Sequence, residues 1–544
     1  MAVRTYLNIT LVVHQGYIRH PVEGESVLQY YDPLFSALSE TYIPLLKLFG
    51  RLEREQVPFA CGMVFSPLWC ALLSDELIQQ RYLAWLDNEI AFGEYELAHL
   101  PSGDPVRPGA QACLDHFRQT RIAYLEDYCG DIPGAFNYFV QAGYIEPLAS
   151  CATHAFLPHY ADMAEVLSAQ IELGLLSHKT FFKFTPEGFW LPHSGYTQGI
   201  EKKLREYGIH YTILDTNGLL FASPLPEKGL FSPARCENSL AVFGRDWGTP
   251  ADIVSKEGFM RHPRYRNQNR DTIFERDTGD IALFFDPREG RIPSSYKYWA
   301  NSGEFYSEEA ARQQAQADAR EFFRRKKERL LGAAQSLPSG EGELSLVSAM
   351  DARILGSKWH EGVWWLEELF RLTAGNSDGI SWIHAEKLLD QQFTLQKITP
   401  YPCASSGVGY GENLLDNSNA YLLRYDRKAA ARMANLAKRF SGEHGIRARM
   451  LNLAAKHVLL AESSDWPRMI QRHHSQNFAA QCFRENIAAF TTIFDSLASN
   501  TISTEWLTEM EKRYPLFPWM NYRAFIGKKS FENQLLFPPA PPPP

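Results

Sequence analysis

The sequence predicts an α/β barrel followed by a separate helical domain. The chain has 544 residues, more than the ~100 to 200 residues of an ordinary domain, and this length leaves room for a barrel with an added domain. Short apolar segments that end at a polar or charged residue recur in its first part, which is the pattern of a parallel β/α barrel. From about residue 426 the strand pattern stops and helical segments follow.

Six segments carry the strand pattern. The predicted strands lie within residues 5–14, 57–65, 181–190, 209–218, 280–287 and 343–351. In a parallel barrel the carboxyl ends of the strands share one face, and that face carries the chemistry. The strand ends that we expect on this face are His14, the segment 188–196, Asp215, Asp286 and Asp351.

Helical patterns account for most of the remaining chain. A long charged helix is predicted over residues 307–331, with Ser307 as its amino-terminal cap. Four amphipathic segments predict a helical carboxy-terminal domain; they cover residues 426–440, 446–463, 483–499 and 503–514. The proline-rich end of the chain cannot form a helix or a strand, so we expect an extended, solvated tail, with binding to a proline-reading module as the alternative.

Composition favours a neutral, sugar-type substrate. The formal net charge is −8 and the isoelectric point about 6.1, so the net field attracts neither nucleic acid nor an anionic membrane. Aromatic residues make up 13% of the chain and provide rings for a carbohydrate groove as well as for the core. No window approaches the ~20 apolar residues of a membrane span, and the amino terminus is too polar for a secretory signal, which predicts a cytoplasmic protein.

Cysteine and histidine spacing predicts no metal and no cofactor. The eight cysteines are scattered, without a Cys-x-x-Cys pair, and we interpret them as reduced thiols. The stretches HQGYIRH and QRHHSQ contain several histidines, but no helical His-x-x-x-His pair with a carboxylate. A zinc hydrolase is therefore the least favoured of three candidate functions. No feature of the sequence indicates an oligomeric state.

The stretch GFWLPHSGY, residues 188–196, is the most informative segment. Its aromatic side chains offer flat apolar faces for a pyranose ring. Its proline and glycine predict a sharp turn that presents His193 to a cleft.

Five stretches, in this order, resemble the sequence regions of glycoside hydrolase family 57, in particular its 1,4-α-glucan branching enzymes and related α-amylase-like proteins. They are LVVHQGYIRHP (11–21), ATHAFLP (152–158), GFWLPHSGY (188–196), AMDARILGSKWHEG (349–362) and LLAESSDWP (459–467). The resemblance implies a distorted (β/α)7 barrel with helical insertions over residues 1–400. It also implies a helical domain that closes the cleft, over residues 401–532. The proline-rich composition of residues 533–544 predicts a flexible tail after that domain.

The resemblance further implies a retaining mechanism on α-1,4-glucan, with a glutamate nucleophile and an aspartate acid/base. Such a mechanism needs two carboxyl groups ~5 to 5.5 Å apart. One attacks the anomeric carbon, and the other protonates the leaving oxygen and then activates the acceptor. Water as the acceptor gives hydrolysis, whereas a glucan 6-hydroxyl gives a branch.

One of these two carboxyl groups is present. Asp351 occupies the acid/base position, and a turn-capping aspartate is its plainer interpretation. The family pattern Trp-Leu-Pro-Glu-Cys-Gly-Tyr has His193 and Ser194 in place of glutamate and cysteine here. An imidazole supplies no negative charge, and removing the nucleophile in another enzyme class costs on the order of 10⁶ in kcat. Glu187 is the alternative carboxylate, but nothing in the sequence places it at the anomeric carbon.

Other positions of the implied cleft also depart from the family pattern. Val12 replaces the first of two histidines, and Arg353, Ser357 and Lys358 replace a glutamate, a histidine and a tryptophan. Gly407 stands where branching enzymes place a stacking tryptophan. Changes at several cleft positions indicate a relaxed or redirected function.

Several positions still match residues that the family uses to bind substrate. They are His14, His154, Trp190, Gly303, Trp359, Asp465 and Trp466. Rings stack on pyranose faces and a carboxylate accepts hydroxyl hydrogen bonds, neither of which needs a nucleophile. For His154 and Trp466, packing at a domain interface is the alternative.

Two functions therefore stand ahead of the zinc hydrolase. The first is a glucan-active enzyme of branching or α-amylase type, with Asp351 as acid/base. The second is a noncatalytic relative that binds glycogen or maltooligosaccharide in a regulatory or scaffold role. Both predict that His14, His154, His193 and Asp351 line one cleft, with Asp465 approaching from the helical domain.

Overall fold

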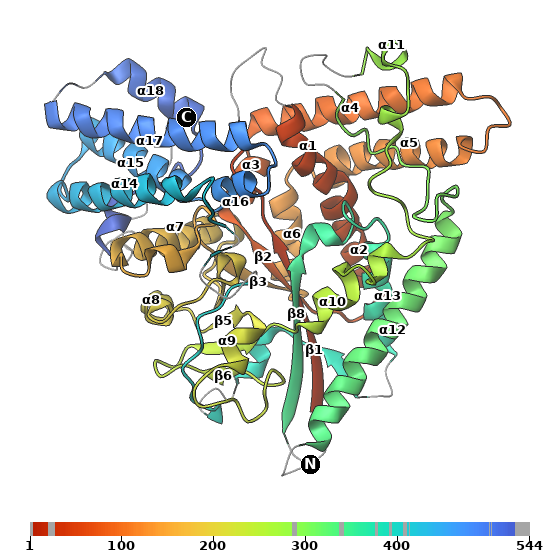
Figure 1. Cartoon of the computed structure of the whole chain (residues 1–544), viewed down its shortest axis with the longest axis horizontal. Coiled ribbons are helices and arrows are strands. Elements are labelled where there is room, and N and C mark those ends of the chain that lie inside the picture. Colours follow the sequence, from red (N-terminus) through yellow and green to blue (C-terminus); the bar gives the residue numbers. More distant parts are fainter. Residues whose placement is uncertain are drawn as a thin grey trace.

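The computed structural model describes residues 4–19, 28–284, 291–336, 342–375, 379–390, 394–405, 411–412, 414–499, 501 and 503–527 (Figure 1). Three features of the sequence predictions lie outside these residues: Asp286, Gly407 and the proline-rich tail.

A single sheet forms the centre of the described chain. Its strands are β1 (Arg4–Val13), β2 (Cys61–Phe65), β3 (Ile145–Ser150), β4 (Gly188–Trp190), β5 (Tyr211–Leu214), β6 (Ala234–Arg235), β7 (Ala241–Gly244), β8 (Glu343–Asp351) and β9 (Ile380–Trp382). Their order is β6-β7-β5-β4-β3-β2-β1-β8, and β9 pairs with β1. All pairs are parallel except β6 with β7.

The sheet curls into a barrel. A parallel bridge between Arg245 and Val347 joins the end of β7 to β8, the strand at the opposite end of the sheet order. The parallel strands β1, β2, β3, β4, β5, β7 and β8 therefore make the predicted distorted (β/α)7 barrel, which is confirmed.

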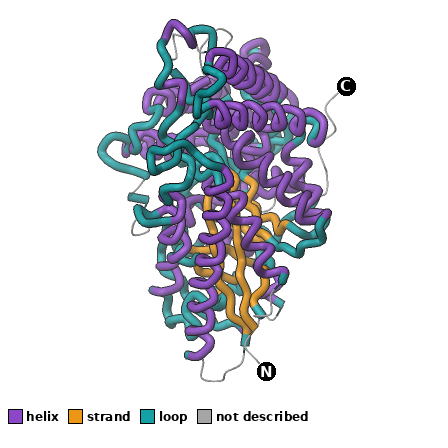
Figure 2. The backbone as a smooth tube through the Cα atoms, turned by 90° about the vertical axis from the view of Figure 1, so that its right-hand side faces the viewer, coloured by secondary structure: helices purple, strands orange, loops and turns teal. Residues whose placement is uncertain are grey.

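Helices surround the strands (Figure 2). Those before the helical domain are α1 (Leu28–Ala37), α2 (Ile43–Arg54), α3 (Pro67–Leu73), α4 (Glu76–His99), α5 (Arg107–Ile122), α6 (Ile132–Gln141), α7 (Ala164–Phe182), α8 (Ile200–Glu206), α9 (Thr216–Leu220), α10 (Gly248–Val254), α11 (Thr278–Ile281), α12 (Glu308–Gln335) and α13 (Gly362–Ala374). The antiparallel pair α4 and α5, orange in Figure 1, is the helical insertion. Ser307 caps α12 as predicted, since its hydroxyl accepts a hydrogen bond from the Ala310 amide.

The carboxy-terminal domain is helical, as predicted. It consists of α14 (Ala420–Arg439), α15 (Gly445–Ala461), α16 (Asp465–Gln471), α17 (Gln476–Ser499) and α18 (Thr504–Arg513), blue in Figure 1. The predicted boundary at residue 400 stays a prediction. The segment just after that boundary still pairs with the barrel, because Tyr196 and Cys403 form an antiparallel bridge.

Two strand predictions differ from the structure, whereas the other four segments each contain a strand. Within residues 181–190 only Gly188–Trp190 is extended, because Lys183 adopts the left-handed conformation (φ 71°) that ends α7. The strand predicted over residues 280–287 is wrong: its first residues complete α11, and an apolar run this short does not distinguish a strand from a packed helical turn.

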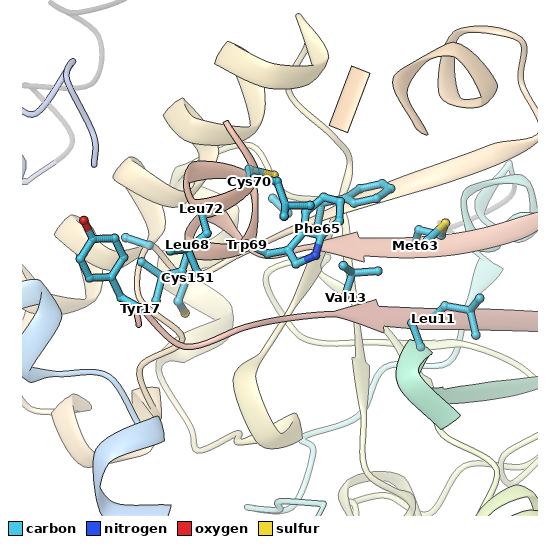
Figure 3. Packing of buried hydrophobic residues seen from close by; sticks show 14 of the residues in the cluster. Leu11, Val13, Tyr17, Met63, Phe65, Leu68, Trp69, Cys70, Leu72 and Cys151 are labelled. Carbon is cyan, nitrogen blue, oxygen red and sulfur yellow. The ribbon is translucent and has the colours of Figure 1, made fainter. Parts of the chain in front are cut away.

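Buried apolar side chains near the carboxyl ends of β1 and β2 hold these two strand ends in place. Leu11 and Val13 of β1 and Phe65 of β2 are buried, and Phe65 and Trp69 pack with ring centroids 5.9 Å apart (Figure 3). Tyr17, beyond the end of β1, stacks on Tyr514 of the helical domain with ring centroids 6.4 Å apart. The carboxyl end of β1 is thus held between the barrel and the helical domain.

Candidate active site

Five polar residues lie at the carboxyl ends of the barrel strands. His14 follows β1, Ser66 follows β2, His154 lies four residues beyond β3, His193 lies three residues beyond β4, and Asp351 ends β8. Because these strands are parallel, their carboxyl ends share the face on which such barrels carry their chemistry.

The three histidines are in contact with one another. The rings of His14 and His154 stack with centroids 3.6 Å apart, and His154 meets His193 edge to face at 5.2 Å. Nδ1 of His14 lies 3.0 Å from Oγ of Ser66, and Nε2 lies 3.1 Å from both carboxylate oxygens of Asp465. Asp465 is the first residue of α16, so the helical domain contributes a carboxylate to this site.

His193 lies in a short turn with a positive φ of 55°. Its Nε2 lies 2.9 Å from Oγ of Ser464, and that hydroxyl donates its own hydrogen to the carbonyl oxygen of His154. The Ser464 oxygen is therefore left to accept from Nε2–H, which fixes the tautomer of His193. Desolvation, reinforced by the positive charge of Arg468, lowers the pKa of His193 to about 3. At neutral pH the ring is uncharged.

Asp351 is paired with two cations. Its Oδ2 accepts from Nη2 of Arg353 and from Nζ of Lys358, each at 2.8 Å, and its Oδ1 accepts from the Arg353 backbone amide at 3.0 Å. Burial alone raises the pKa of this carboxyl, but the two cations outweigh burial and hold it well below the ordinary range. Asp351 is consequently ionised at neutral pH and lacks the proton that a general acid donates.

Arg468, on α16, connects the two parts of the site. It interacts electrostatically with His193, Asp465 and Asp351. We call the set His14, His154, His193, Asp351, Ser464, Asp465 and Arg468 the strand-end cluster. The sequence did not single out Arg468 or Ser464, and the one available signal was their position beside Asp465.

Glu187 does not belong to the strand-end cluster. It precedes β4, whereas His193 follows that strand, so the strand separates the two residues. The Glu187 side chain is half-exposed and lies 3.2 Å from Nδ1 of His210. The structure therefore gives no support to Glu187 as a substitute nucleophile.

The predicted stacking tryptophans are buried. Trp359 and Trp466 are each 1% exposed. Trp359 packs against the ring of Tyr265, and the indole N–H of Trp466 donates to the carbonyl of Leu460. Trp190, 5% exposed, packs inside the barrel. Glucan stacking stays a prediction for these three residues, while core packing is what the structure shows.

Gly303 lies apart from the contacts of the strand-end cluster. It has φ +89° in the turn of a short hairpin closed by the bridge between Trp299 and Phe305. Its left-handed conformation favours glycine, so the local backbone by itself explains why a glycine occupies this position.

We expect the Asp351 pKa to depend on its two cations. In an Arg353→Met/Lys358→Met variant the two cations that outweigh burial are gone, so the Asp351 pKa rises. A carbon-13 NMR titration of the carboxyl carbon measures this shift. Lys387→Met, which removes an exposed lysine paired with Glu386, is the control and leaves the Asp351 titration unchanged. An unshifted Asp351 pKa in the double variant contradicts the assignment.

Within the described ranges, no group of three or more His, Cys, Asp or Glu side chains is arranged to hold a metal ion. Across the same residues, every helix is too short or too polar to span a membrane.

Known proteins resemble this chain over most of its length. The sequence profile of glycosyl hydrolase family 57 matches residues 9–319, and the carboxy-terminal profile of 1,4-alpha-glucan branching enzymes matches residues 426–525. A 1,4-alpha-glucan branching enzyme of Thermococcus kodakarensis is 25% identical over 87% of this chain and 71% of its own length. A probable 1,4-alpha-glucan branching enzyme of Mycobacterium tuberculosis is 24% identical over 84% of this chain and 86% of its own.

Solved structures resemble the whole described fold. The alpha-amylase AmyC from Thermotoga maritima superposes with a TM-score of 0.88 at 27% identity, covering 96% of this chain and 99% of its own. The branching enzyme of Pyrococcus horikoshii superposes with a TM-score of 0.84 at 22% identity, covering 96% of both chains, and supports the fold alone.

Proposed function

The chain belongs to glycosyl hydrolase family 57, and from this premise we propose that it is an α-1,4-glucan-acting protein of branching-enzyme or α-amylase type whose catalysis is impaired. Relatives that match most of the chain are described as branching enzymes, and a similar solved structure is described as an alpha-amylase. A cytoplasmic location and a role in glycogen metabolism belong to the same proposal. The metabolic role is supported by the description of the relatives as 1,4-alpha-glucan branching enzymes.

The main support for impaired catalysis is the neutral, hydrogen-bonded state of His193 at the nucleophile position. Its ring nitrogen is held by Ser464 and carries no negative charge at neutral pH. The covalent intermediate of a retaining glycosidase and its oxocarbenium-like transition state both need a carboxylate there.

The state of Asp351 adds a second obstacle. A general acid works best with a pKa near the operating pH, whereas Arg353 and Lys358 hold the pKa of Asp351 well below its ordinary range. Arg353 and Lys358 stand where the family pattern has a glutamate and a tryptophan, so the changes at these two positions also keep Asp351 without its proton.

The second candidate function is noncatalytic binding of glycogen or maltooligosaccharide. Hydrogen bonds that orient the side chains of the strand-end cluster favour this binding function. His14 of the barrel contacts Asp465 of the helical domain, and Ser464 of that domain contacts His154 and His193. Oriented hydroxyl, imidazole and carboxylate groups bind sugar hydroxyls without a nucleophile.

Glycogen binding is the direct test of both candidates. We expect native electrophoresis in gels that contain glycogen to retard the chain. Calorimetry with maltohexaose should give a Kd of about 1 mM, which corresponds to about −4 kcal/mol. His193→Ala, which removes a ring from the strand-end cluster, should weaken this binding, and Lys387→Met serves as the surface control. No retardation and no heat at millimolar sugar would leave shared ancestry without glucan binding.

A further inference from the structure

A cavity of about 790 Å³ lies beside the segment that leaves Asp351, which is residues 352–364 and follows Asp351 directly in the chain. Arg353 and Lys358 of this segment bind Asp351, whereas His360 and Trp364, farther along it, line the cavity. The other walls come from α2, α5, the start of α12 and the loops before α12. No member of the strand-end cluster lines this cavity, so it is separate from the candidate active site.

One wall of the cavity is aromatic. The rings of Tyr306 and His360 lie 6.1 Å apart, and those of His360 and Trp364 lie 5.6 Å apart, measured between centroids. The guanidinium of Arg312 lies 4.4 Å from the centroid of the Trp364 ring and supports it. Phe117 of α5 also lines the cavity. Such rings offer the apolar faces on which a sugar ring packs.

A buried ion pair lies at the same cavity. Nη2 of Arg266 lies 2.7 Å from Oε2 of Glu40, and their side chains are 6% and 3% exposed. Nε of Arg266 is buried and has no hydrogen-bond partner among the described residues. A fixed carboxylate beside a fixed guanidinium presents acceptors and donors side by side, which matches the donor and acceptor character of neighbouring sugar hydroxyls.

Neutral imidazoles complete the polar lining. Desolvation, opposed by Glu40, lowers the pKa of His116 to about 4, and desolvation together with Arg266 holds the pKa of His360 well below its usual value. Nε2 of His116 is buried without a hydrogen-bond partner in the part of the chain that the structure describes. An uncharged imidazole donates at one nitrogen and accepts at the other, which suits a hydroxyl.

The basic side chains around the cavity already interact with acidic groups of the protein, so the lining does not favour an anionic ligand. Burial raises the pKa of Asp32 to about 7 and also raises those of Glu89 and Asp271. Lys297 opposes each of these shifts, so its positive charge already interacts with carboxyl groups of the protein. Three further basic residues of the lining are also paired: Arg266 with Glu40, Arg51 with Glu367 and Arg312 with Glu308.

We propose that this cavity is a second carbohydrate site, which takes a short segment of neutral maltooligosaccharide. Its volume falls in the range of about 300 to 1,000 Å³ that is typical of small-molecule sites. Aromatic faces, a charged pair and uncharged imidazoles together match a neutral polyhydroxyl ring. The choice of a glucose oligomer rests on the proposed function, whereas the choice of a neutral sugar rests on the cavity itself.

Maltotetraose is the probe that tests the second site. Calorimetry on the native chain should resolve two binding sites, and saturation-transfer NMR should show contact with sugar protons. Trp364→Ala and His116→Ala should each weaken one site at least ~10-fold and leave the other unchanged, because an aromatic or hydrogen-bonding contact contributes on this scale. His193→Ala should weaken only the site at the strand ends. Trp247→Ala removes an exposed ring outside the cavity and should change neither site.

The outcomes separate the second site from the proposed function. Native-like binding by both Trp364→Ala and His116→Ala, with loss in His193→Ala, overturns the second site and leaves the proposed function intact. If Trp364→Ala and His116→Ala lose maltotetraose binding while His193→Ala binds like the native chain, the second site is supported and glucan binding at the strand ends is overturned. Binding of ATP that Trp364→Ala abolishes, with no maltotetraose bound there, overturns the neutral ligand. Circular dichroism melts of both cavity variants check that each is folded, and His116→Ala carries the test if Trp364→Ala unfolds.

Discussion

Amylose incubated with the native chain keeps its iodine colour, and neither new reducing ends nor new branch points accumulate. We expect this result because His193 supplies no carboxylate and Asp351 holds no proton at neutral pH. Loss of a nucleophile costs on the order of 10⁶ in kcat, so the remaining rate should fall below detection in an overnight assay.

Restoring the nucleophile alone should recover only a trace of turnover. In His193→Glu the carboxylate returns, but Arg353 and Lys358 still hold Asp351 ionised. A triple variant with His193→Glu, Arg353→Glu and Lys358→Trp restores the family pattern at all three positions, and we expect it to exceed His193→Glu alone. The gain should exceed the sum of the single changes, because residues that act as one catalytic unit are far from additive.

Two controls show whether the recovered activity uses the strand-end cluster. Adding Asp351→Asn to the triple variant should abolish turnover, whereas adding Glu187→Gln should leave it unchanged, since Glu187 pairs with His210 before β4. Robust turnover by the native chain that is abolished by Asp351→Asn and insensitive to Glu187→Gln would falsify the disabled site. In that case His193 or another carboxylate supports catalysis.

Replacing Lys326 by Met should destabilise the chain by about 3 to 5 kcal/mol. Nζ of Lys326 lies 2.7 Å from Oδ2 of Asp246 and 2.8 Å from Oδ2 of Asp252, and the side chains of Lys326 and Asp246 are fully buried. Removing the Lys326 charge leaves the desolvated Asp246 carboxylate with Arg329 as its remaining cation among the described residues. Asp246 also donates its backbone N–H to Val347 of β8, so the effect falls where the barrel closes. Urea unfolding followed by circular dichroism measures the change.

Arg325→Met is the matched control for Lys326→Met. Arg325 is the preceding residue of α12 and also pairs with Asp252, but its side chain is 43% exposed. Exposed pairs contribute about 0 to 1 kcal/mol, so the control should change stability by no more than that. Equal destabilisation by the two variants would show that the buried pair has no special role.

The Asp246 contribution should also depend on pH. Burial raises the Asp246 pKa, but the charges of Lys326 and Arg329 outweigh burial and lower this pKa to about 2. Because this value lies below the unfolded pKa of about 3.9, the stabilisation is complete above the unfolded pKa and is lost as the pH falls toward 2. Urea unfolding between pH 5 and 2 should show a shallower loss of stability in Lys326→Met than in the native chain.

Much of the barrel is predictable because strand signals are local. The segment of β8 ends its apolar run at Asp351, and the segment of β1 ends at His14, as a strand-end pattern requires. The strand β3 is hidden by Glu146 and Pro147, two residue types that disfavour strands. Glu146 is buried there because its carboxylate accepts from the hydroxyl of Tyr211 and from backbone amides near residue 385. No local pattern contains those partners.

The contacts of the strand-end cluster could be predicted from the sequence only in part. Motif order indicated that His14, His193 and Asp465 share a site, but the bridging hydroxyl of Ser464 and the charge of Arg468 belong to no motif. The cavity beside the segment that leaves Asp351 had no sequence signal at all, since its walls come from four separate parts of the chain.

The sequence by itself determined that the nucleophile position carries no carboxylate, because no fold gives an imidazole a negative charge. The tertiary structure decided the protonation of the residues that remain. His193 is neutral because the surrounding protein desolvates it and because the positive charge of Arg468 disfavours its protonated form. Ser464, 271 positions away in sequence, fixes its tautomer. His14 meets Asp465 across 451 positions. Desolvation and Coulomb interactions depend on distance and burial in space, so only the folded chain sets these charges.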